Sequence, residues 1–401
     1  MSTGSSVHNC PFDYAEALEF DPVLRRLMTE EPVARIRLPH GEGDAWLVTG
    51  YDDVRTVTTD RRFSRHAVVG RDFPRMTPEP IVQDEAINVM DPPASSRLRS
   101  LVSKGFAPDQ IDRMRPRIRA AVNELLDRMA EQRDVADLME HLAGPLPLIT
   151  ICEVLEIPAA DQGQLRAHAR TMMDIGIDNR AAAVQAKADL RNYFTALTAQ
   201  RRADPGEDLI SVLATARDGD EILDDRELAV MAMVLLITGQ DTTTYELGNL
   251  SYTLLTRPEV HTALRERREE LPQIINELLR FIPFRKGVGI PRVATEDVEL
   301  SGVTIPAGDI VHVSYLTANR DGRKFDRPDE LDLDRTSPPH MTFGWGAHHC
   351  LGAPLAQAEI ETAIGTLLDR FPGIALARPA EDIKWNTTSI WRYPLALPVS
   401  W

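Results

Sequence analysis

Hydrophobic and polar positions first follow the period of strands and then, over most of the chain, the period of helices. Near the N-terminus, apolar positions over 33–38 and 45–49 flank a Gly-Glu-Gly turn, which predicts a β-hairpin. Asp52 or Asp53 is expected to cap the short helix that follows. From 64 to 90 the periodicity is lost, which predicts a long irregular loop, and loops of this kind in compact domains are usually functional.

The middle of the chain has apolar residues at i, i+3 and i+4 spacing, which is the period of an α-helix. The longest helix is expected to begin at Asp224 or Asp225 and to run past Leu250. It is apolar on several sides and is interrupted by the polar string 239–243. A shorter helix is expected over 272–281, before a proline. The other expected helices cover 108–133, 136–155, 161–178 and 181–203.

Three strand-like segments follow, at 298–300, 303–305 and 310–315. A loop from 319 to 343 then leads to a glycine-rich turn, and a last helix is expected over 354–371. The pattern predicts a mainly α fold with a small β portion. Because we find no Gly/Ser linker, low-complexity tract or repeat, we expect one domain over residues 1–401.

Composition excludes several classes of protein. The 401 residues are 43% hydrophobic and 26% charged, which is ordinary for a globular protein and too apolar for a disordered one. No apolar run approaches the roughly 18 residues of a membrane span, and the N-terminus lacks the features of a signal peptide. We therefore expect a cytoplasmic protein with no membrane anchor. The net charge of −16 argues against nucleic-acid binding as the main activity.

Cysteine usage leaves one candidate for chemistry. The chain has 3 cysteines and no CxxC pair, which excludes a disulfide scaffold and a tetrathiolate metal site. Cys350 follows a glycine-rich stretch and precedes a helix, where N–H groups and the helix dipole favour thiolate over thiol. This arrangement suits a sulfur ligand to haem iron. The residues also permit an inert buried cysteine or, less readily, a zinc site with His348 and His349.

The turn resembles the haem-binding loop of the cytochromes P450, which are haem-thiolate monooxygenases. Three other motifs of that family occur in the expected order, and the resemblance covers essentially the whole chain. It implies the single-domain cytochrome P450 fold, haem b with Cys350 as its axial ligand, and dioxygen as a co-substrate. The residues that carry it are Phe343-Gly344-Trp345-Gly346-Ala347-His348-His349-Cys350-Leu351-Gly352, Asp241-Thr242, Glu277-Leu278-Leu279-Arg280 and Pro291-Arg292-Val293-Ala294.

The resemblance gives Asp241 and Thr242 a catalytic role, in which Asp241 relays protons from solvent and Thr242 assists oxygen activation. In the family these residues lie in a distorted helix. The alternative is a kink stabilised by bonding of the threonine hydroxyl to the helix backbone. The chain has Thr238 where the family usually has alanine.

Glu277 and Arg280 lie three residues apart on one helix face, a spacing that most often produces a solvated pair. The resemblance implies instead a buried structural pair that holds the loop before the cysteine turn, with Arg335 as a possible third member.

The haem propionates need cationic partners, and the family positions map to Arg99, Arg292 and His348. Phe343, Gly344 and Gly352 belong to the cofactor loop. Ser95 stands where the family usually has histidine, so one propionate contact is expected to be weaker or mediated by water.

Electrons must come from separate proteins, because the chain carries no reductase motif. The resemblance implies a ferredoxin and a ferredoxin reductase as donors, and a monomeric enzyme. A basic stretch is either ordinary solvated surface or a docking site for an acidic ferredoxin. It consists of Arg97, Lys104, Arg113 and Arg117.

Family resemblance also locates a mostly apolar substrate pocket with a few hydrogen-bond donors, which suits a medium-sized organic molecule bearing carbonyls or phenols. Its expected residues are Arg65, Val234, Ile237, Phe284, Arg285, Lys286, Val288, Ile290, Ile390 and Trp391, with further ones near 172–178. Each of them could equally be a packed or a solvated residue.

Several segments, including Phe20–Leu24 and Arg285–Gly289, resemble the actinomycete enzymes of the biflaviolin synthase group and enzymes that dimerise tryptophan-containing diketopiperazines. We therefore expect oxidative coupling of aromatic molecules in secondary metabolism. Hydroxylation of an aromatic or macrocyclic natural product is the alternative, since the Asp-Thr pair is retained. A haem-binding protein without turnover is the third hypothesis.

Overall fold

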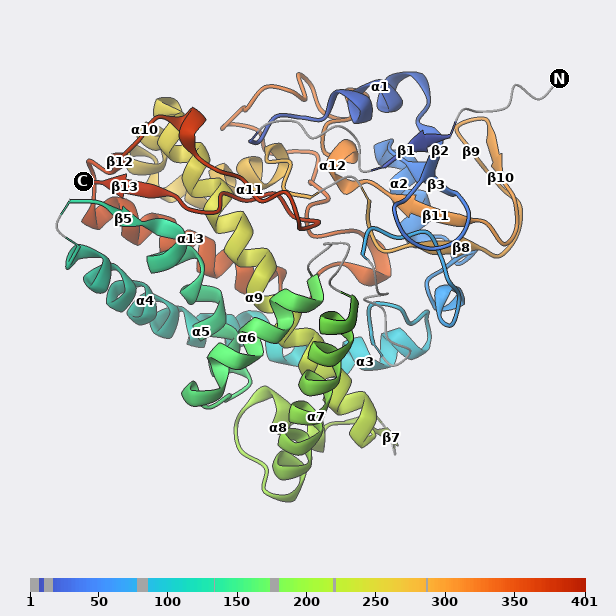
Figure 1. The fold of residues 1–401 in the computed structure, drawn as a ribbon, viewed down its shortest axis with the longest axis horizontal. Coiled ribbons are helices and arrows are strands. Elements are labelled where there is room, and N and C mark those ends of the chain that lie inside the picture. Colours follow the sequence, from blue (N-terminus) through green and yellow to red (C-terminus); the bar gives the residue numbers. More distant parts are fainter. Residues whose placement is uncertain are drawn as a thin grey trace.

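The computed structural model describes residues 7–10, 17–77, 86–132, 134–173, 180–218, 221–285 and 288–401. A mainly helical body packs beside a smaller region of β-strands (Figure 1). This arrangement confirms the expected fold class. The predictions over 78–85, 174–178 and at Lys286 lie outside the described residues.

The β region joins N-terminal strands to strands from 292–313 in one six-stranded sheet with the order β1-β2-β3-β11-β8-β4. The predicted hairpin is confirmed, because Val33 pairs with Val48 in an antiparallel register. β11 then runs parallel to β3 and antiparallel to β8. In the second pair, Arg292 of β8 lies opposite Val311 of β11. The strands are β1 (His8–Asn9), β2 (Val33–Arg37), β3 (Ala45–Val48), β4 (Phe63–Ser64), β8 (Arg292–Ala294) and β11 (Ile310–Val313).

The helix after the hairpin, α2 (Tyr51–Thr59), begins earlier than expected. Its N-cap is Gly50, and Asp52 and Asp53 occupy the first turn instead, so the predicted cap was wrong. The reason is tertiary: the amide of Tyr51 donates to Asp321 Oδ2 at 2.8 Å, which satisfies a free N–H group that a local cap would otherwise bond.

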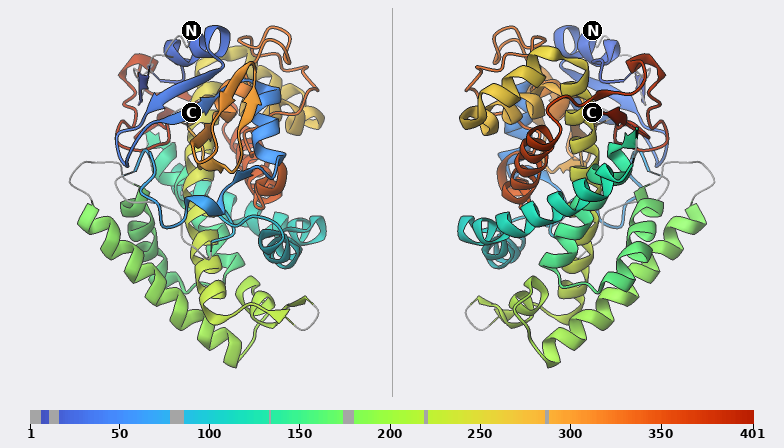
Figure 2. Two further views of the ribbon diagram at one scale, coloured as in Figure 1. Left: turned by 90° about the vertical axis from the view of Figure 1, so that its right-hand side faces the viewer. Right: turned by 90° about the vertical axis from the view of Figure 1, so that its left-hand side faces the viewer.

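α9 (Asp225–Thr256) runs through the middle of the molecule in both side views (Figure 2). Its start is confirmed, because Asp224 and Glu227 form a reciprocal capping box. The helix continues through the polar string 239–243 and past Leu250, as expected. Gly239 lets a neighbouring helix approach closely, since a Cβ there would lie 2.9 Å from the Ile151 side chain.

The predicted helix over 136–155 is divided. Ala136–Asp137 forms strand β5, which pairs with β13 (Pro398–Ser400), and a π-helical turn over Met139–Ala143 follows. α5 (Pro145–Val154) begins only at a proline, which cannot donate a helical hydrogen bond to the turn before it. Helical periodicity alone could not reveal this pairing with the distant C-terminus.

The other long helices agree with the pattern to within a few residues, and the predicted strands at 298–300 and 303–305 have the predicted bounds. The predicted loop 319–343 contains no strand or helix of this set. These elements are α4 (Pro108–Ala130), α6 (Ala159–Met173), α7 (Arg180–Ala203), α11 (Leu271–Phe281), α13 (Ala353–Arg370), β9 (Val298–Leu300) and β10 (Val303–Ile305).

Short elements escaped the pattern, because a few apolar positions cannot define a period. The helices are α1 (Pro22–Glu30), α3 (Ala94–Val102), α8 (Leu209–Thr215), α10 (Pro258–Glu266) and α12 (Tyr315–Ala318), and the strands are β6 (Arg217–Asp218), β7 (Glu221–Ile222) and β12 (Ala375–Leu376). Among the described residues, no single helix has the length and apolar character to cross a membrane; one bent pair, Met139–Val154 with Ala159–Met172, passes that test only when taken together.

Candidate functional site

A cavity of about 410 Å³ lies where α9, the cysteine turn, the start of α13 and the end of β11 at Val313 meet. It collects most of the residues that the sequence singled out, from segments far apart in the chain. The predicted pocket residues that line it are Arg65, Val234, Ile237, Phe284, Arg285, Val288, Ile290, Ile390 and Trp391, and the predicted cofactor and catalytic residues are Arg99, Thr242, Phe343, Gly344, His348, Cys350 and Gly352.

The cysteine turn is held in a fixed shape by its backbone. The amide of Cys350 donates to the carbonyl of Phe343 at 2.8 Å, and α13 begins three residues later. Gly344 and Gly346 have φ values of 76° and 71°, in the left-handed region that favours glycine. A Cβ at Gly346 would lie 2.5 Å from the carbonyl oxygen of Thr58, so a side chain there would displace the turn.

Cys350 is an accessible thiol, and its access is to the cavity, since the residue lies deep inside the molecule. Burial raises its pKa, whereas the N–H groups of Gly352 and Ala353 and the charge of Arg99 lower it. The donors that we predicted are present, but they do not make the thiolate the favoured form by themselves, which corrects that expectation. A coordinated metal ion would supply the remaining stabilisation, because metal binding deprotonates a thiol.

The zinc interpretation finds no support in the described part of the chain, which contains no group of three or more His, Cys, Asp or Glu residues placed to hold a metal ion. Among the described residues, Cys350 therefore does not belong to a metal-binding cluster of such side chains.

Buried cations converge on one side of the cavity. Arg292, which is 1% exposed, has no hydrogen-bond partner for Nη1 or Nη2. Burial together with the positive charges of Arg65, Arg292 and Arg99 lowers the pKa of His348 far below its usual value. Such a cluster is costly unless an anion binds it. The two carboxylates of haem satisfy this requirement, so the residues fit the cofactor that the resemblance implies.

Arg65 and Tyr315 also belong to this cluster, in addition to the expected propionate partners. Burial lowers the pKa of Arg65 to about 9, and its Nη1 donates to the carbonyl of Asn88 at 2.8 Å. Arg65 was expected in the substrate pocket, and Tyr315 was not expected in this cluster. The pKa of Tyr315 is lowered overall, because Arg292, Arg65 and Arg285 outweigh the effect of burial. Ser95 is buried, and its hydroxyl has no hydrogen-bond partner.

Thr242 and Asp241 lie on different faces of α9. Thr242 lines the cavity and donates a hydrogen bond of 2.7 Å to the carbonyl of Thr238. This is the backbone bonding that we considered as the alternative, and the helix remains continuous around it. Thr238 also lines the cavity and donates to the carbonyl of Val234 at 2.7 Å.

The Asp241 carboxyl is buried, and it is not among the residues that line the cavity. Burial raises its pKa, while Arg170 and Arg166 of α6, the Gln240 amide and the Tyr245 hydroxyl act in the opposite direction. The amide of Gln240 donates to Asp241 Oδ1 at 3.0 Å, and Oδ2 has no hydrogen-bond partner. The carboxyl therefore lies between the cavity helix and α6.

Glu277 and Arg280 form a buried pair, with Arg280 Nε 2.7 Å from Glu277 Oε2. Arg280 also donates to the carbonyls of Asn319 and Pro328 at 2.8 and 2.9 Å. Arg335 lies 3.2 Å from Glu277 Oε2, as the third member of the group. These bonds join α11 to the loop that leads to the cysteine turn.

A stacked pair of aromatic rings lines the cavity. Phe284 and Trp391 are stacked with their ring centroids 4.7 Å apart and their planes at 14°. The guanidinium of Arg285 lies 4.7 Å from the centroid of the Trp391 ring. Burial lowers the pKa of Arg285 to about 10, so the side chain is cationic at neutral pH.

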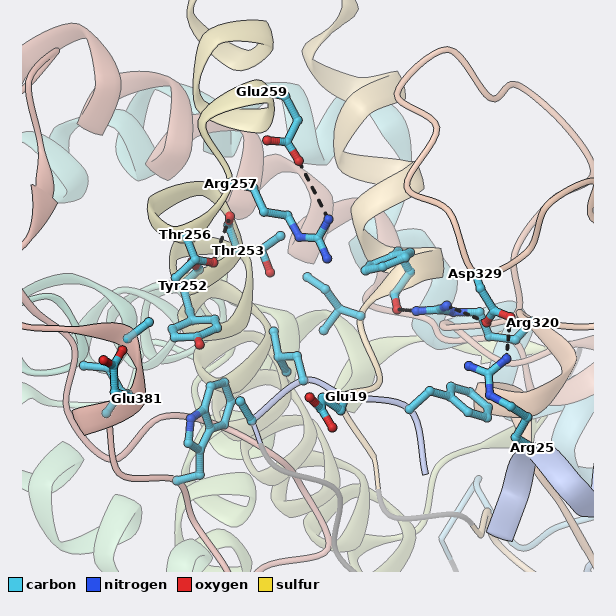
Figure 3. Close-up of a pocket in the computed structure, with 18 of the residues that line it drawn as sticks. Glu19, Arg25, Tyr252, Thr253, Thr256, Arg257, Glu259, Arg320, Asp329 and Glu381 are labelled. Atoms are coloured by element: carbon cyan, nitrogen blue, oxygen red, sulfur yellow. Dashed lines mark hydrogen bonds and ion pairs between the residues drawn. The ribbon is translucent and has the colours of Figure 1, made fainter. Parts of the chain in front are cut away.

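A larger cleft of about 1120 Å³ lies elsewhere, near the C-terminal end of α9 (Figure 3). Its arginines are already paired: Arg257 with Glu259 at 3.7 Å, and Arg320 with Asp329 at 3.0 Å. Asp329 also pairs with Arg25. The smaller cavity, with its accessible thiol and its buried cations that have no carboxylate partner, is the better candidate for chemistry in spite of its size.

The basic stretch is dispersed over α3, the turn after it and α4. Arg97 pairs with Glu227, and Arg113 lies 3.8 Å from Asp109. Lys104 and Arg117 are exposed. Docking of a ferredoxin to this face stays a prediction.

Comparison with known proteins gives one consistent result. The family model described as "Cytochrome P450" matches residues 163–378. The chain is 42% identical to nocardicin C N-oxygenase of Nocardia uniformis subsp. tsuyamanensis over 100% of both chains, and 41% identical to biflaviolin synthase of Streptomyces coelicolor over 96% of this chain and 93% of that enzyme. A solved structure, cytochrome P450mel 107F1 "with biaryl coupling reactivity", has 70% sequence identity and a TM-score of 0.97, and the match covers 99% of this chain and 100% of that one.

Proposed function

Because this chain belongs to the cytochrome P450 family, we propose that it joins two phenolic aromatic molecules by oxidative coupling. The family binds haem b through a cysteine thiolate, and the relatives belong to actinomycete secondary metabolism. The coupling removes one hydrogen atom from each aromatic molecule and forms one aryl–aryl bond. With two electrons and two protons from outside, those two hydrogen atoms reduce one dioxygen to two waters, which balances the reaction.

The observation that carries the proposal is the position of Arg285 against the stacked pair of Phe284 and Trp391. A flat aromatic ring can lie beside these stacked rings, and the buried cation over the Trp391 ring attracts a phenol or phenolate oxygen. Among the described residues no carboxylate forms an ion pair with Arg285, so its charge is free for a ligand. The similarity to a structure with biaryl coupling reactivity supports the same conclusion.

The bound cofactor supplies the oxidising centre at which dioxygen is activated. Cys350 would hold its iron, and Arg99, Arg292 and His348 would hold its propionates. Thr242, at the cavity, would direct a proton inward from its helix face, and Asp241, on the side of α6, would replace that proton from solvent. Arg285 would orient one phenol on the aromatic surface.

We propose ferredoxin and ferredoxin reductase as the electron donors, a cytoplasmic location and a monomeric state, as the family resemblance implies. Exposed Lys104 and Arg117 would then belong to the docking face for the acidic ferredoxin.

Hydroxylation is the second candidate function, and the specific observation in its favour is Thr242 at the cavity. Several relatives are named for it, including mycinamicin IV hydroxylase/epoxidase at 41% identity. Both reactions would use the same residues, so the product decides between them.

The experiment supplies surrogate ferredoxin and reductase and offers a polyhydroxynaphthoquinone together with a tryptophan diketopiperazine. Mass spectrometry of the products is the measurement. Coupling predicts a product at the sum of two naphthoquinone masses less two hydrogens. A product one oxygen heavier than one of the substrates would show hydroxylation instead of coupling. Dimers of the diketopiperazine alone would show coupling of a substrate class other than phenols.

A further inference from the structure

Thr238 lies on α9 one turn before Thr242, and both side chains line the cavity. Thr238 is exposed, in contrast to the buried residues that flank it on most of the helix, and its 2.7 Å hydrogen bond to the carbonyl of Val234 also lies on accessible surface. Because α9 runs through the middle of the molecule (Figure 2), this surface belongs to the cavity. The chain thus places a hydroxyl here, where the family usually has the methyl group of alanine.

The hydroxyl of Thr238 can accept a hydrogen bond but has no hydrogen left to donate. Its single hydrogen is directed to the Val234 carbonyl, which leaves the oxygen lone pairs for a ligand. Thr242 repeats the arrangement one turn later, since its hydroxyl donates to the carbonyl of Thr238. One face of α9 therefore presents two hydroxyl acceptors about 6 Å apart.

An acceptor of this kind selects a partner that carries hydrogen on oxygen or nitrogen. A bound haem offers no such group, because its ring nitrogens bind iron and its carboxylates would be held by the cationic cluster. A phenol can donate its O–H group, whereas a phenolate or an aryl ether cannot. Arg285 has the opposite character, because it is cationic at neutral pH and favours a phenolate oxygen. The cavity thus contains two anchors that select different forms of a phenol.

We propose that Thr238 determines specificity by accepting a hydrogen bond from the protonated phenol of one aromatic molecule, while Arg285 binds the phenolate oxygen of the other. The part that concerns two rings rests on the proposed coupling, whereas the bond to Thr238 needs only one bound phenol. With each ring held at its own anchor, the two anchors decide which carbons meet and so which coupled isomer forms. No proton or electron is transferred at Thr238, which only orients the ring.

The test measures the dissociation constants of 2-naphthol and of its methyl ether for the holoenzyme, from the substrate-induced spectral shift. The ratio of the two constants, ether over phenol, is compared among wild type, Thr238→Val and Thr238→Ser. Valine has nearly the shape of threonine without the hydroxyl, so the variant should fold and keep the haem spectrum. We expect the ratio to fall about fivefold in Thr238→Val, which corresponds to one hydrogen bond, and to be kept in Thr238→Ser. Arg285 is present in all three proteins, so its contribution cancels.

The matched control is Thr195→Val on α7. The hydroxyl of Thr195 makes the same helix bond, to the carbonyl of Arg191 at 2.8 Å, and Thr195 is also exposed, but it does not line the cavity. This variant should keep the wild-type ratio. A second readout is the proportion of coupled isomers formed from the polyhydroxynaphthoquinone, which should change in Thr238→Val and return to that of wild type in Thr238→Ser.

The two proposals fail in different ways. An unchanged ratio of dissociation constants in Thr238→Val would show that only water meets this hydroxyl, and would overturn the role of Thr238 whatever the product is. A wild-type enzyme that forms only oxygenated product would overturn the coupling and the two-ring arrangement. In that case a fall in the ratio would still support the hydrogen bond from a single phenol to Thr238.

Discussion

The hydroxyl of Thr242 donates to the backbone carbonyl of Thr238, one turn earlier in α9, over 2.7 Å. The hydroxyl is thus held at the cavity surface with its oxygen free to accept a second hydrogen bond. To give its own proton to a group in the cavity, Thr242 must release the carbonyl. The same helix bond therefore fixes the position of the hydroxyl and opposes its use as a donor.

We predict that Thr242→Ala uncouples oxygen consumption from product formation. The Ala side chain cannot hold or direct a proton at the cavity, so reduced oxygen should leave as peroxide about tenfold more often. The measurement is peroxide formed against product formed at saturating substrate. Thr242→Ser keeps the hydroxyl and is the control. Wild-type coupling in the Ala variant would remove Thr242 from the proton route.

The buried pair of Glu277 and Arg280 should determine stability rather than catalysis. Arg280→Met leaves the Glu277 carboxylate buried with Arg335 and the amide of Asp332 as its remaining partners, and loses the bonds to the 319–335 loop. We expect a loss of about 3–5 kcal/mol in the free energy of unfolding. Urea unfolding followed by circular dichroism measures it.

The control for that experiment is the pair of Arg327 and Glu330, which has the same i, i+3 spacing and is more than half exposed. Arg327→Met should change the free energy of unfolding by less than about 1 kcal/mol, since exposed ion pairs contribute little. Equal effects at the two sites would contradict the structural role of the buried pair.

Arg65 should compensate for the serine at position 95. Its buried guanidinium is one of the charges that act on His348, beside Arg292, and so belongs to the cationic cluster. We predict that Arg65→Ala increases the rate of haem loss about 10- to 100-fold, which corresponds to one charge-assisted hydrogen bond. Transfer of haem to apomyoglobin measures this rate. Arg62→Ala, at a residue paired with Asp60 on the surface, is the control. An unchanged rate of haem loss in Arg65→Ala would show that Arg65 does not hold the haem and would favour its expected place in the substrate pocket.

The α9 helix and the cysteine turn show what could be predicted from sequence. A capping box marks the start of α9 through residues three apart, and the glycines at 344 and 346 are required by local backbone angles. Such signals involve residues only a few positions apart, so they can be recognised in the sequence alone.

Contacts between distant segments could not be predicted in this way. The start of α2 depends on Asp321, and strand β5 exists because the C-terminal strand pairs with it. The site illustrates the same limit. Motifs identified Cys350 and Thr242, whereas Tyr315 became a candidate only when the cavity and the charges around it were known.

Arg285 should contribute to substrate binding through its charge. We predict that Arg285→Gln weakens binding of a phenolic substrate about 10-fold or more, while the haem spectrum without substrate is unchanged. Titration of the substrate-induced spectral shift measures the dissociation constant. Arg285→Lys keeps the charge and should lose less affinity. Equal affinities for wild type and the Gln variant would exclude the phenol contact that the coupling proposal requires.

His312 should make stability depend on pH. Its ring nitrogens lie 2.9 Å from the carbonyl oxygen of Gly289 and 3.1 Å from that of Pro74, and burial lowers its pKa to about 4. Because the pKa in the folded state lies below that of an unfolded histidine, near 6.5, the unfolded chain binds the proton first as the pH falls. The stabilisation is complete above pH ~6.5 and is lost progressively towards pH ~4.

We predict that wild type loses about 2 kcal/mol of unfolding free energy between pH ~7 and ~5 through this residue. His312→Asn should remove that part of the pH dependence in urea unfolding, and the exposed His66→Asn should not. The same slope in His312→Asn as in wild type would show that other groups cause the loss.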